Sequence, residues 1–361
     1  MRRYHGVRID RPLLQGYKYS AHRGPFPTNI INKKLSSSIH RVFHNTTNLN
    51  MDSFADNFIL SLPPWSGSRF TYPHINHSVP PSLSPSKNLL PQPFTAIVTG
   101  ASRGIGAAIS KCLAHAGATG IIITARKLES LSTTKQELES ISKDIKVVAM
   151  AADNSKEESA ISIKETVEEE FGGKLDLLVN NAGIVSTNES AFKAMHEMDA
   201  SQFEIPIMTN LLGRFYMSKH LLPCLLASDR PTKSIVNISS IGSNISGPLG
   251  FSISAMATNR LSQRVAESYG KDGVFCVAVH PGAVLPKDED IPPGFPPSVK
   301  EWSKDAPELC GSFVISLIRR EWQEREWLNG RYLDCTWDVD ELWKKKEEVV
   351  EGDKLRVKLI V

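Results

Sequence analysis

The sequence lacks the features of membrane proteins and of nucleic-acid-binding proteins. No apolar run approaches the roughly 20 residues that a membrane-spanning helix needs. The net charge is only +3, from 42 basic and 39 acidic side chains, and no Lys/Arg-rich run alternates with aromatic residues. Nothing in the charge therefore favours nucleic acid. We expect a soluble, cytoplasmic protein that has neither a nucleic-acid nor a membrane partner.

Cysteine is also scarce, and its spacing excludes the usual metal sites. No two of the five cysteines stand at a metal-ligand spacing: Cys112, Cys224, Cys276, Cys310 and Cys335. We interpret them as reduced thiols in a cytosolic setting, and we predict no metal.

Acidic residues are nearly absent from the first 50 residues, where Asp10 alone faces nine Lys and Arg side chains. A basic, Ser-containing, acid-poor start suits a mitochondrial presequence, which remains the minor alternative for localisation. Residues such as Pro12 and Gly16 interrupt any amphipathic helix, however. We favour an upstream extension of a chain whose working start is Met51.

Residues 51–93 are rich in Pro and Ser and have few periodic apolar positions. Such a segment buries too little to order itself, so it either wraps the surface or stays mobile. The sequence therefore predicts a low-order N-terminal extension over residues 1–93 and one catalytic domain over residues 94–361.

From Phe94 onward, short apolar strands alternate with segments of helical length. Continuous apolar strands are buried on both faces, as in a parallel sheet between helices. The predicted strands are Phe94–Thr99, Gly120–Thr124, Ile145–Met150, Leu175–Val179, Lys233–Ile238 and Val274–Val279. The predicted helices are 104–116, 127–142, 155–171, 201–226 and 251–269. This alternation predicts an α/β fold with a doubly wound parallel sheet.

A glycine-rich loop follows the first strand and leads directly into a helix. Gly100 allows a tight turn, Gly104 lets a pyrophosphate approach the backbone, and Gly106 lets helix and strand pack closely. The helix start offers free N–H groups to phosphate oxygens. Glycines also mark plain turns, but the position between a strand and a helix predicts a dinucleotide site. The loop comprises Gly100, Ser102, Arg103, Gly104, Ile105 and Gly106.

The residues after the second strand indicate which nicotinamide cofactor is bound. A carboxylate there would hold the ribose 2′-hydroxyl of NAD, but the sequence reads Thr124-Ala125-Arg126. Arg126 and Arg103 can instead pair with a 2′-phosphate. Two ordinary solvated arginines are the alternative. The sequence favours NADP(H), with NADPH as the reduced form.

The ordered motifs resemble the short-chain dehydrogenase/reductase family, and the features of the C-terminal tail have a weaker resemblance to enzymes of fungal secondary metabolism. The resemblance implies a Rossmann sheet of seven strands in the order 3-2-1-4-5-6-7, ending near Gly330–Tyr332 with a short helix over Trp337–Val350. It implies a homodimer or homotetramer formed through the fourth and fifth helices, and a small-molecule substrate. It assigns cofactor contacts to Asp153, Asn181, Ala182, Gly183, Pro281, Gly282 and Val284, and catalytic roles to Asn210 and Ser240, with Ser239 as the alternative serine.

Two catalytic positions of that family hold residues that cannot perform its chemistry. The family takes its proton from a Tyr whose pKa a Lys four residues later lowers, and a spacing of four puts both on one helical face. Here Phe251 occupies the Tyr position and Ala255 the Lys position. A positioned acid contributes about 10²–10⁴-fold, so reduction of ordinary ketones should be slowed at least that much.

Three interpretations remain open. The first is an oxidoreductase whose substrate needs no protein acid, with Ser240, Ser254 or His280 as substitute proton sources. The second is a non-redox isomerase or scaffold, and the third is an NADP-binding protein without activity. Each candidate also has a structural interpretation: Ser240 can end a strand, Asn210 can brace a helix, and a strand-end His280 is more often structural. Pro286–Lys304 is either a lid over the substrate or an inert surface loop.

Overall fold

Seven parallel strands form one sheet in the order β3-β2-β1-β4-β5-β6-β7, which confirms the predicted doubly wound architecture. The computed structural model describes residues 62–185, 189–285 and 303–359. The strands are β1 Thr95–Thr99, β2 Gly120–Ala125, β3 Lys146–Ala151, β4 Leu177–Asn180, β5 Ser234–Ile238, β6 Phe275–His280 and β7 Tyr332–Asp334. Every predicted strand is present, with ends shifted by one or two residues.

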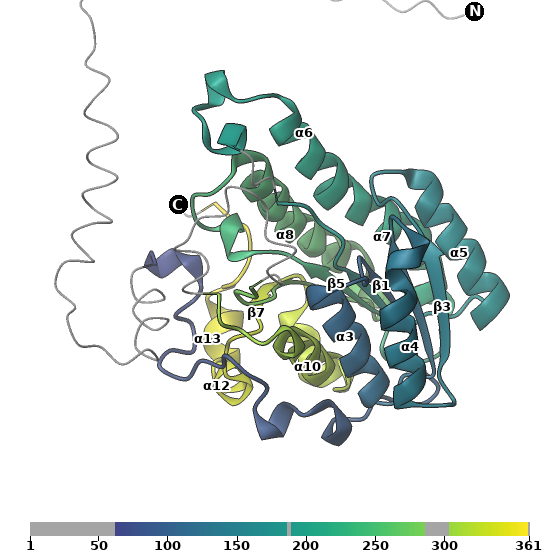
Figure 1. Ribbon diagram of the computed structural model, residues 1–361. Helices are drawn as coiled ribbons and strands as arrows, with labels where there is room; N and C mark the ends of the chain where they lie inside the picture. The colour runs from purple at the N-terminus through teal and green to yellow at the C-terminus, as the bar shows by residue number, and fades with distance from the viewer. Residues whose placement is uncertain (1–61, 186–188, 286–302, 360–361) are drawn as a thin grey trace, which may run out of the picture. The chain divides into compact units, whose positions relative to one another are not determined.

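Helices cover both faces of the sheet (Figure 1), because the strands are apolar on both sides. One face packs against α3 (Gly104–His115), α4 (Ser132–Ile141) and α10 (Pro307–Ile318). The other packs against α5 (Glu157–Phe171), α7 (Gly213–Ala227) and α8 (Leu249–Tyr269). The two faces therefore carry two separate hydrophobic cores.

Shorter elements connect these layers. They are η1 Pro64–Ser66, η2 Pro81–Leu83, η3 Pro85–Lys87, η4 Leu128–Leu131, η5 Glu189–Phe192, η6 Met195–Glu197, α6 Ser201–Pro206, the π-helical η7 Ile207–Leu212, η8 Ile241–Ser243, η9 Gly270–Asp272, α11 Trp322–Arg325, η11 Glu326–Leu328, α12 Val339–Lys344 and α13 Lys346–Glu351. The predicted helix over 201–226 is thus divided into three pieces. Helix α10 was not predicted.

The segment before β1 packs against the domain over its described part, residues 62–93, where composition predicted low order. Leu83 and Leu90 belong to the main core. Trp337 is fully buried, stacks against Phe70 with ring centroids 5.0 Å apart, and donates its Nε1–H to the Gly67 carbonyl at 3.1 Å. Tertiary contacts therefore hold this part of the segment against the domain. The calls for residues 1–61 lie outside the described residues.

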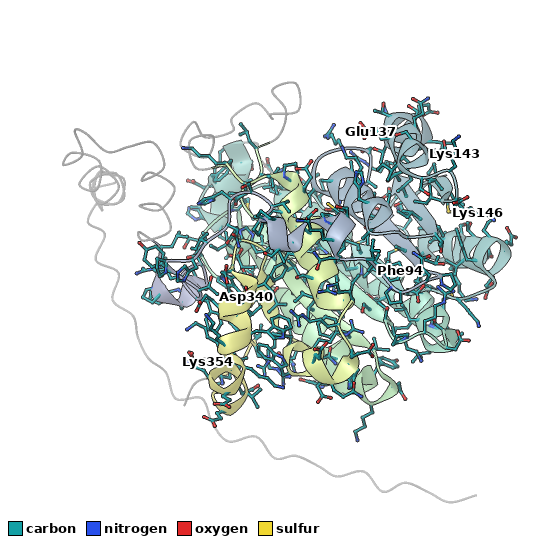
Figure 2. All side chains as sticks on the ribbon, turned by 90° about the horizontal axis from the view of Figure 1, so that it is seen from below. Phe94, Glu137, Lys143, Lys146, Asp340 and Lys354 are labelled. Carbon is teal, nitrogen blue, oxygen red and sulfur yellow. The ribbon has the colours of Figure 1, made fainter. Side chains whose placement is uncertain are left out.

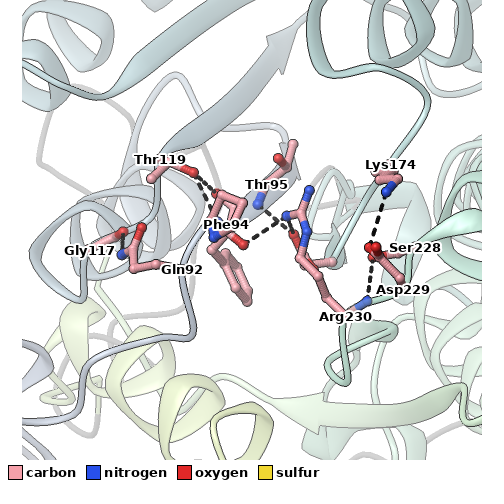
Figure 3. A network of polar contacts seen from close by, with 11 residues as sticks. Gln92, Phe94, Thr95, Gly117, Thr119, Lys174, Ser228, Asp229 and Arg230 are labelled. Carbon is pink, nitrogen blue, oxygen red and sulfur yellow. Dashed lines mark hydrogen bonds and ion pairs between the residues drawn. The ribbon is translucent and has the colours of Figure 1, made fainter.

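The edge of the sheet where the strands begin is held by a buried carboxylate. Asp176 accepts a hydrogen bond from the Thr95 amide at 2.7 Å and pairs with the Arg230 guanidinium. Figure 3 shows Arg230 reaching toward Thr95 and Phe94, with an outer pair between Lys174 and Asp229 at 3.2 Å. The carboxylate side chain is 1% exposed. It joins the starts of β1 and β4 to the loop before β5.

Replacing Asp176 by Ala is expected to lower the free energy of unfolding by about 3 kcal/mol, because it leaves the Thr95 amide without its acceptor and the partly buried Arg230 guanidinium without its counter-charge. Urea denaturation would measure the change. The matched control is Asp229→Ala, which removes an exposed partner of Lys174 and should leave stability unchanged within error. Equal losses in both variants would contradict the importance of the buried carboxylate.

Figure 2 shows Glu137, Lys143 and Lys146 toward one end of the molecule and Asp340 and Lys354 toward another. Lys146 is the first residue of β3. Among the described residues, no helix is long and apolar enough to cross a membrane. No group of three potential metal-binding side chains was found among them either, and all five cysteines are buried and free.

Candidate active site

The glycine loop between β1 and α3 uses each glycine for a different steric reason. Gly100 has φ +66°, and a Cβ there would lie 2.9 Å from the Cα of Ala182. Gly104 has φ +57° and open space where a Cβ would be. A Cβ at Gly106 would lie 2.4 Å from the Gly100 carbonyl oxygen. The loop thus turns tightly, stays open at Gly104 and packs closely at Gly106.

The start of α3 is available to an anion. Arg103 is the N-cap residue, its backbone is extended, and its side chain makes no capping hydrogen bond. The first N–H groups of a helix have no partner within the helix and lie at the positive end of its dipole. Together with the open space at Gly104, this arrangement fits the pyrophosphate of a dinucleotide.

The end of β4 is tied to the glycine loop through Thr99. The amides of Asn181 and Ala182 both donate to the Thr99 hydroxyl at 3.0 Å. The Asn181 side chain donates to the carbonyls of Thr99 at 2.8 Å and Gly100 at 3.0 Å. These four bonds hold Ala182 and Gly183 beside the loop, so one floor is built from the ends of two neighbouring strands.

The ends of β2 and β3 bring Arg126 near Asp153. Arg126 is exposed. Asp153 accepts hydrogen bonds from the Ser155 amide and hydroxyl at 2.9 and 2.8 Å. Burial would raise the pKa of Asp153, but the Ser155 hydrogen bonds and the nearby Lys156 and Arg126 charges outweigh it, so the pKa is lowered. The corner therefore carries an ionised carboxylate near an exposed arginine side chain.

Two adjacent serines follow β5, and their hydroxyls point to different partners. Ser239 donates to the Asn259 amide oxygen at 2.6 Å and is buried against α8. The Ser240 hydroxyl accepts from the Gly242 amide at 3.0 Å. A Cβ built at Gly242 would lie 3.1 Å from the Phe251 ring and 3.3 Å from the Ser240 oxygen. The Ser240 oxygen and the Phe251 ring thus both lie close to Gly242, whereas the Ser239 hydroxyl is bonded to Asn259.

Asn210 connects three segments around this place. Its side-chain oxygen accepts from the Ile184 amide at 2.8 Å, and its nitrogen donates to the Ile184 carbonyl at 2.9 Å and the Ser254 hydroxyl at 3.1 Å. Asn210 lies in the π-helical turn η7, and its side chain is 2% exposed. The wider turn presents the side chain to both the end of β4 and the start of α8.

A protein-family model described as short chain dehydrogenase matches residues 94–288. The chain belongs to the short-chain dehydrogenase family. Among curated relatives, the short chain dehydrogenase pgmD of Aspergillus terreus is 36% identical, with 83% of this chain and 96% of the relative covered. The short chain dehydrogenase citE of Monascus ruber is 35% identical, with 73% of this chain and 88% of the relative covered. Fungal short-chain dehydrogenases are thus similar over most of the chain.

Solved structures of this family share the fold. A putative short-chain alcohol dehydrogenase from Sinorhizobium meliloti superposes with a TM-score of 0.57 at 25% identity, covering 71% of this chain and 98% of that one. The L-sorbose reductase of Gluconobacter frateurii, solved with NADPH and L-sorbose, gives 0.56 at 22% identity, covering 67% and 94%. The second likeness supports the fold alone.

The loop after β6 is held by Asp305 and His77, neither of which was predicted from the sequence. Gly282 has φ +81°, and the Ala283 amide donates to the Asp305 carboxylate at 2.5 Å. His77, from the segment before β1, contacts the other oxygen of Asp305 at 2.6 Å. Pro281, Gly282 and Val284 lie in this loop. The predicted lid residues 286–302 lie outside the described residues.

His280 ends β6 directly beside the two serines. Its Nδ1 accepts from the Ile241 amide at 3.2 Å, and its side chain is buried. Ile241 follows Ser240, so the imidazole helps to set the backbone after the serine. This contact supports the structural role that a strand-end histidine usually has.

Arg214 is the site residue that sequence reasoning missed. Its guanidinium is buried within the floor described above, next to Asn210. Burial lowers the pKa of Arg214 to about 10, which still leaves it charged at neutral pH. The only signal in the sequence was a charged residue between Gly213 and Phe215, in a helix whose other inward positions are apolar or small.

Proposed function

We propose that this short-chain dehydrogenase is an NADP(H)-dependent oxidoreductase that acts on a small organic substrate without the family's Tyr–Lys proton donor. One observation supports this proposal: the start of α3 has no side-chain cap, and open space lies beside Gly104. Arg103 and Arg126 are exposed near this helix start. This arrangement suits a pyrophosphate and a 2′-phosphate. We place the protein in the cytoplasm, and we propose assembly as a homodimer or homotetramer through the helices over 201–226 and α8.

Different residues would bind different parts of the NADP(H) molecule. Backbone N–H groups from Gly100 to Gly106 would hold the pyrophosphate. Arg103 and Arg126 would pair with the 2′-phosphate, and Asp153 would accept from the adenine amino group. Asn181–Gly183 and the Pro281–Val284 loop would flank the nicotinamide half. When bound, the cofactor supplies or accepts a hydride.

The proton that accompanies hydride transfer needs another source. Phe251 has no hydroxyl, and Ala255 has no charge. Ser240 keeps a hydroxyl beside the Phe251 ring, where it can hydrogen-bond a substrate oxygen. We propose a substrate that needs no protein acid, such as a charged iminium or a group that water protonates. Catalysis then rests on position and charge stabilisation.

Loss of the Tyr and Lys also supports a second candidate, a non-redox isomerase, scaffold or inactive NADP-binding protein on the same fold. The two candidates differ in one measurement. Hydride transfer consumes the near-ultraviolet absorbance of NADPH when a substrate is added, whereas isomerisation or scaffolding leaves that absorbance unchanged. A panel of imines and ketones in this assay would decide between them.

We expect NADPH to bind about 10–100-fold more tightly than NADH, because a charge-assisted contact to the 2′-phosphate contributes about 1.5–3 kcal/mol. Arg126→Gln should remove most of this difference without affecting NADH. Isothermal titration calorimetry on the full chain gives both affinities. The control is Arg264→Gln, which changes an exposed arginine paired with Glu267 on α8. Tighter binding of NADH by the wild type would refute the cofactor assignment.

A further inference from the structure

The Arg214 guanidinium lies where four segments of the site meet. Its Nη2 donates to the Ile238 carbonyl at the end of β5 at 2.6 Å, and its Nε to the Asn180 carbonyl at the end of β4 at 3.5 Å. Its Nη1 donates to the Asn210 carbonyl and to the Thr258 hydroxyl of α8 at 3.3 Å. Backbone oxygens and one hydroxyl thus surround a full positive charge.

No carboxylate within the described residues offsets this charge. Burial is the only cause that shifts the pKa of Arg214. A buried charge with neutral acceptors keeps a longer-ranged field than one paired with an acid, because low-dielectric surroundings screen it weakly. The field of Arg214 therefore extends into whatever lies on the floor above it.

Gly183 forms that floor directly above the guanidinium. A Cβ built on Gly183 would lie 3.5 Å from the Arg214 Nη2 and 3.3 Å from the Asn210 side-chain oxygen, and Gly183 itself is exposed. A ligand atom in contact with the Cα of Gly183 would stand within roughly 9 Å of the charge, because the Cα–Cβ bond adds about 1.5 Å and the contact adds about 4 Å. The position is the nicotinamide half of the proposed cofactor site.

The family's missing lysine belongs to the same neighbourhood. Ser254 contacts Asn210, and Thr258 contacts Arg214, so α8 lies against η7 and α7 on either side of position 255. An arginine from α7 therefore stands beside the place where a lysine from α8 would bring a cation.

We propose that Arg214 is a specificity-determining residue whose buried charge makes the site prefer the reduced cofactor, supplying from α7 the positive charge that Ala255 cannot supply from α8. This inference rests on the proposed function. NADP+ carries a positive nicotinamide ring, whereas the ring of NADPH is neutral, and their phosphates are the same. The buried cation would repel only the oxidised form, so the site would bind NADPH in preference to NADP+.

The experiment measures the affinities of the full chain for NADP+ and NADPH by calorimetry and compares their ratio between variants. Because the phosphates are common to both, the ratio isolates the charge at the ring. The wild type should bind NADPH more tightly by a factor on the order of ten. Arg214→Lys, which keeps the charge, should keep most of this ratio. Arg214→Gln should bring it close to one, and adding Ala255→Lys to Arg214→Gln should restore it.

Arg325 provides a matched control. It is also fully buried, and its guanidinium donates to the carbonyls of Pro231 and Thr232 and to the hydroxyl of Ser234, at the opposite end of β5. Arg325→Gln should lower stability as Arg214→Gln does but leave the ratio unchanged. If Arg214→Gln does not fold, Arg214→His at a pH of about 8, where histidine is neutral, takes its place with the same expected ratio near one.

The possible results distinguish a failure of the proposed function from a failure of this inference. A wild type that binds neither nucleotide refutes the proposed function and this inference with it. A wild type that binds both forms equally refutes the inference alone. A ratio that survives in Arg214→Gln or Arg214→His, or that falls equally in Arg325→Gln, also overturns it, because the charge of Arg214 would then not be the cause.

Discussion

Changing Phe251 to Tyr and Ala255 to Lys together is expected to raise NADPH-dependent reduction of a simple ketone by at least about 100-fold. Both positions lie on α8, four residues apart, so the two new side chains share one face of the helix. The Phe251 ring and the Ser240 hydroxyl both lie close to Gly242. A hydroxyl on that ring would therefore lie near the serine that we propose to bind the substrate oxygen.

The lysine is required because an unassisted tyrosine holds its proton too strongly. Its ammonium group lowers the tyrosine pKa, and Arg214 adds to that field. We expect Phe251→Tyr alone to gain less than the pair, and Ala255→Lys alone to gain little. Steady-state kinetics with the same ketone would show this. Wild-type turnover of ordinary ketones at the usual rates of the family would contradict our interpretation of the site.

The second large effect is expected from adding one methyl group at Gly106. A Cβ there would meet the Gly100 carbonyl at 2.4 Å and the Asn181 side-chain nitrogen at 2.5 Å, both far inside normal contact distance. Gly106→Ala must push the start of α3 away from the loop or break the Asn181 bonds. We expect NADPH affinity to fall at least about 100-fold, as loss of two or more charge-assisted hydrogen bonds would cause.

Gly172→Ala is the control for this substitution. Gly172 is the C-cap residue of α5 and has a φ of +61°, and nothing lies within 4 Å of a Cβ added there. That variant should cost about 1 kcal/mol of stability from backbone strain and leave NADPH binding unchanged. Equal NADPH affinity in the wild type and in Gly106→Ala would exclude a role for this glycine in the nucleotide site.

The local pattern of apolar residues was enough to predict the sheet but not every helix. Continuous apolar strands and the glycines between β1 and α3 are visible in short windows of sequence, so the strands were predicted to within one or two residues. Helix α10 is almost wholly buried, and uniformly apolar residues show no helical period. The π-helical turn that carries Asn210 leaves no periodic signal either, because it is a single insertion within a longer helix.

Some residues of the site were likewise predictable from local sequence, and others were not. Gly100, Gly104 and Gly106 were predictable because each serves a backbone conformation or a close approach beside its own segment. The different partners of Ser239 and Ser240 depend on Asn259 and Gly242, and the partners of Arg214 come from β4, β5 and α8. Because these partners are far apart in the chain, no periodic pattern in the sequence predicts their contacts.

By itself the sequence determined the alternation of strands and helices, the nucleotide loop and the loss of the Tyr–Lys pair, since each depends on residue type at a fixed local spacing. Only the tertiary structure decided which serine faces Phe251, what orders residues 62–93 and where the buried charge of Arg214 lies. Those facts follow from packing, because the ends of neighbouring parallel strands bring together residues that are far apart in the chain.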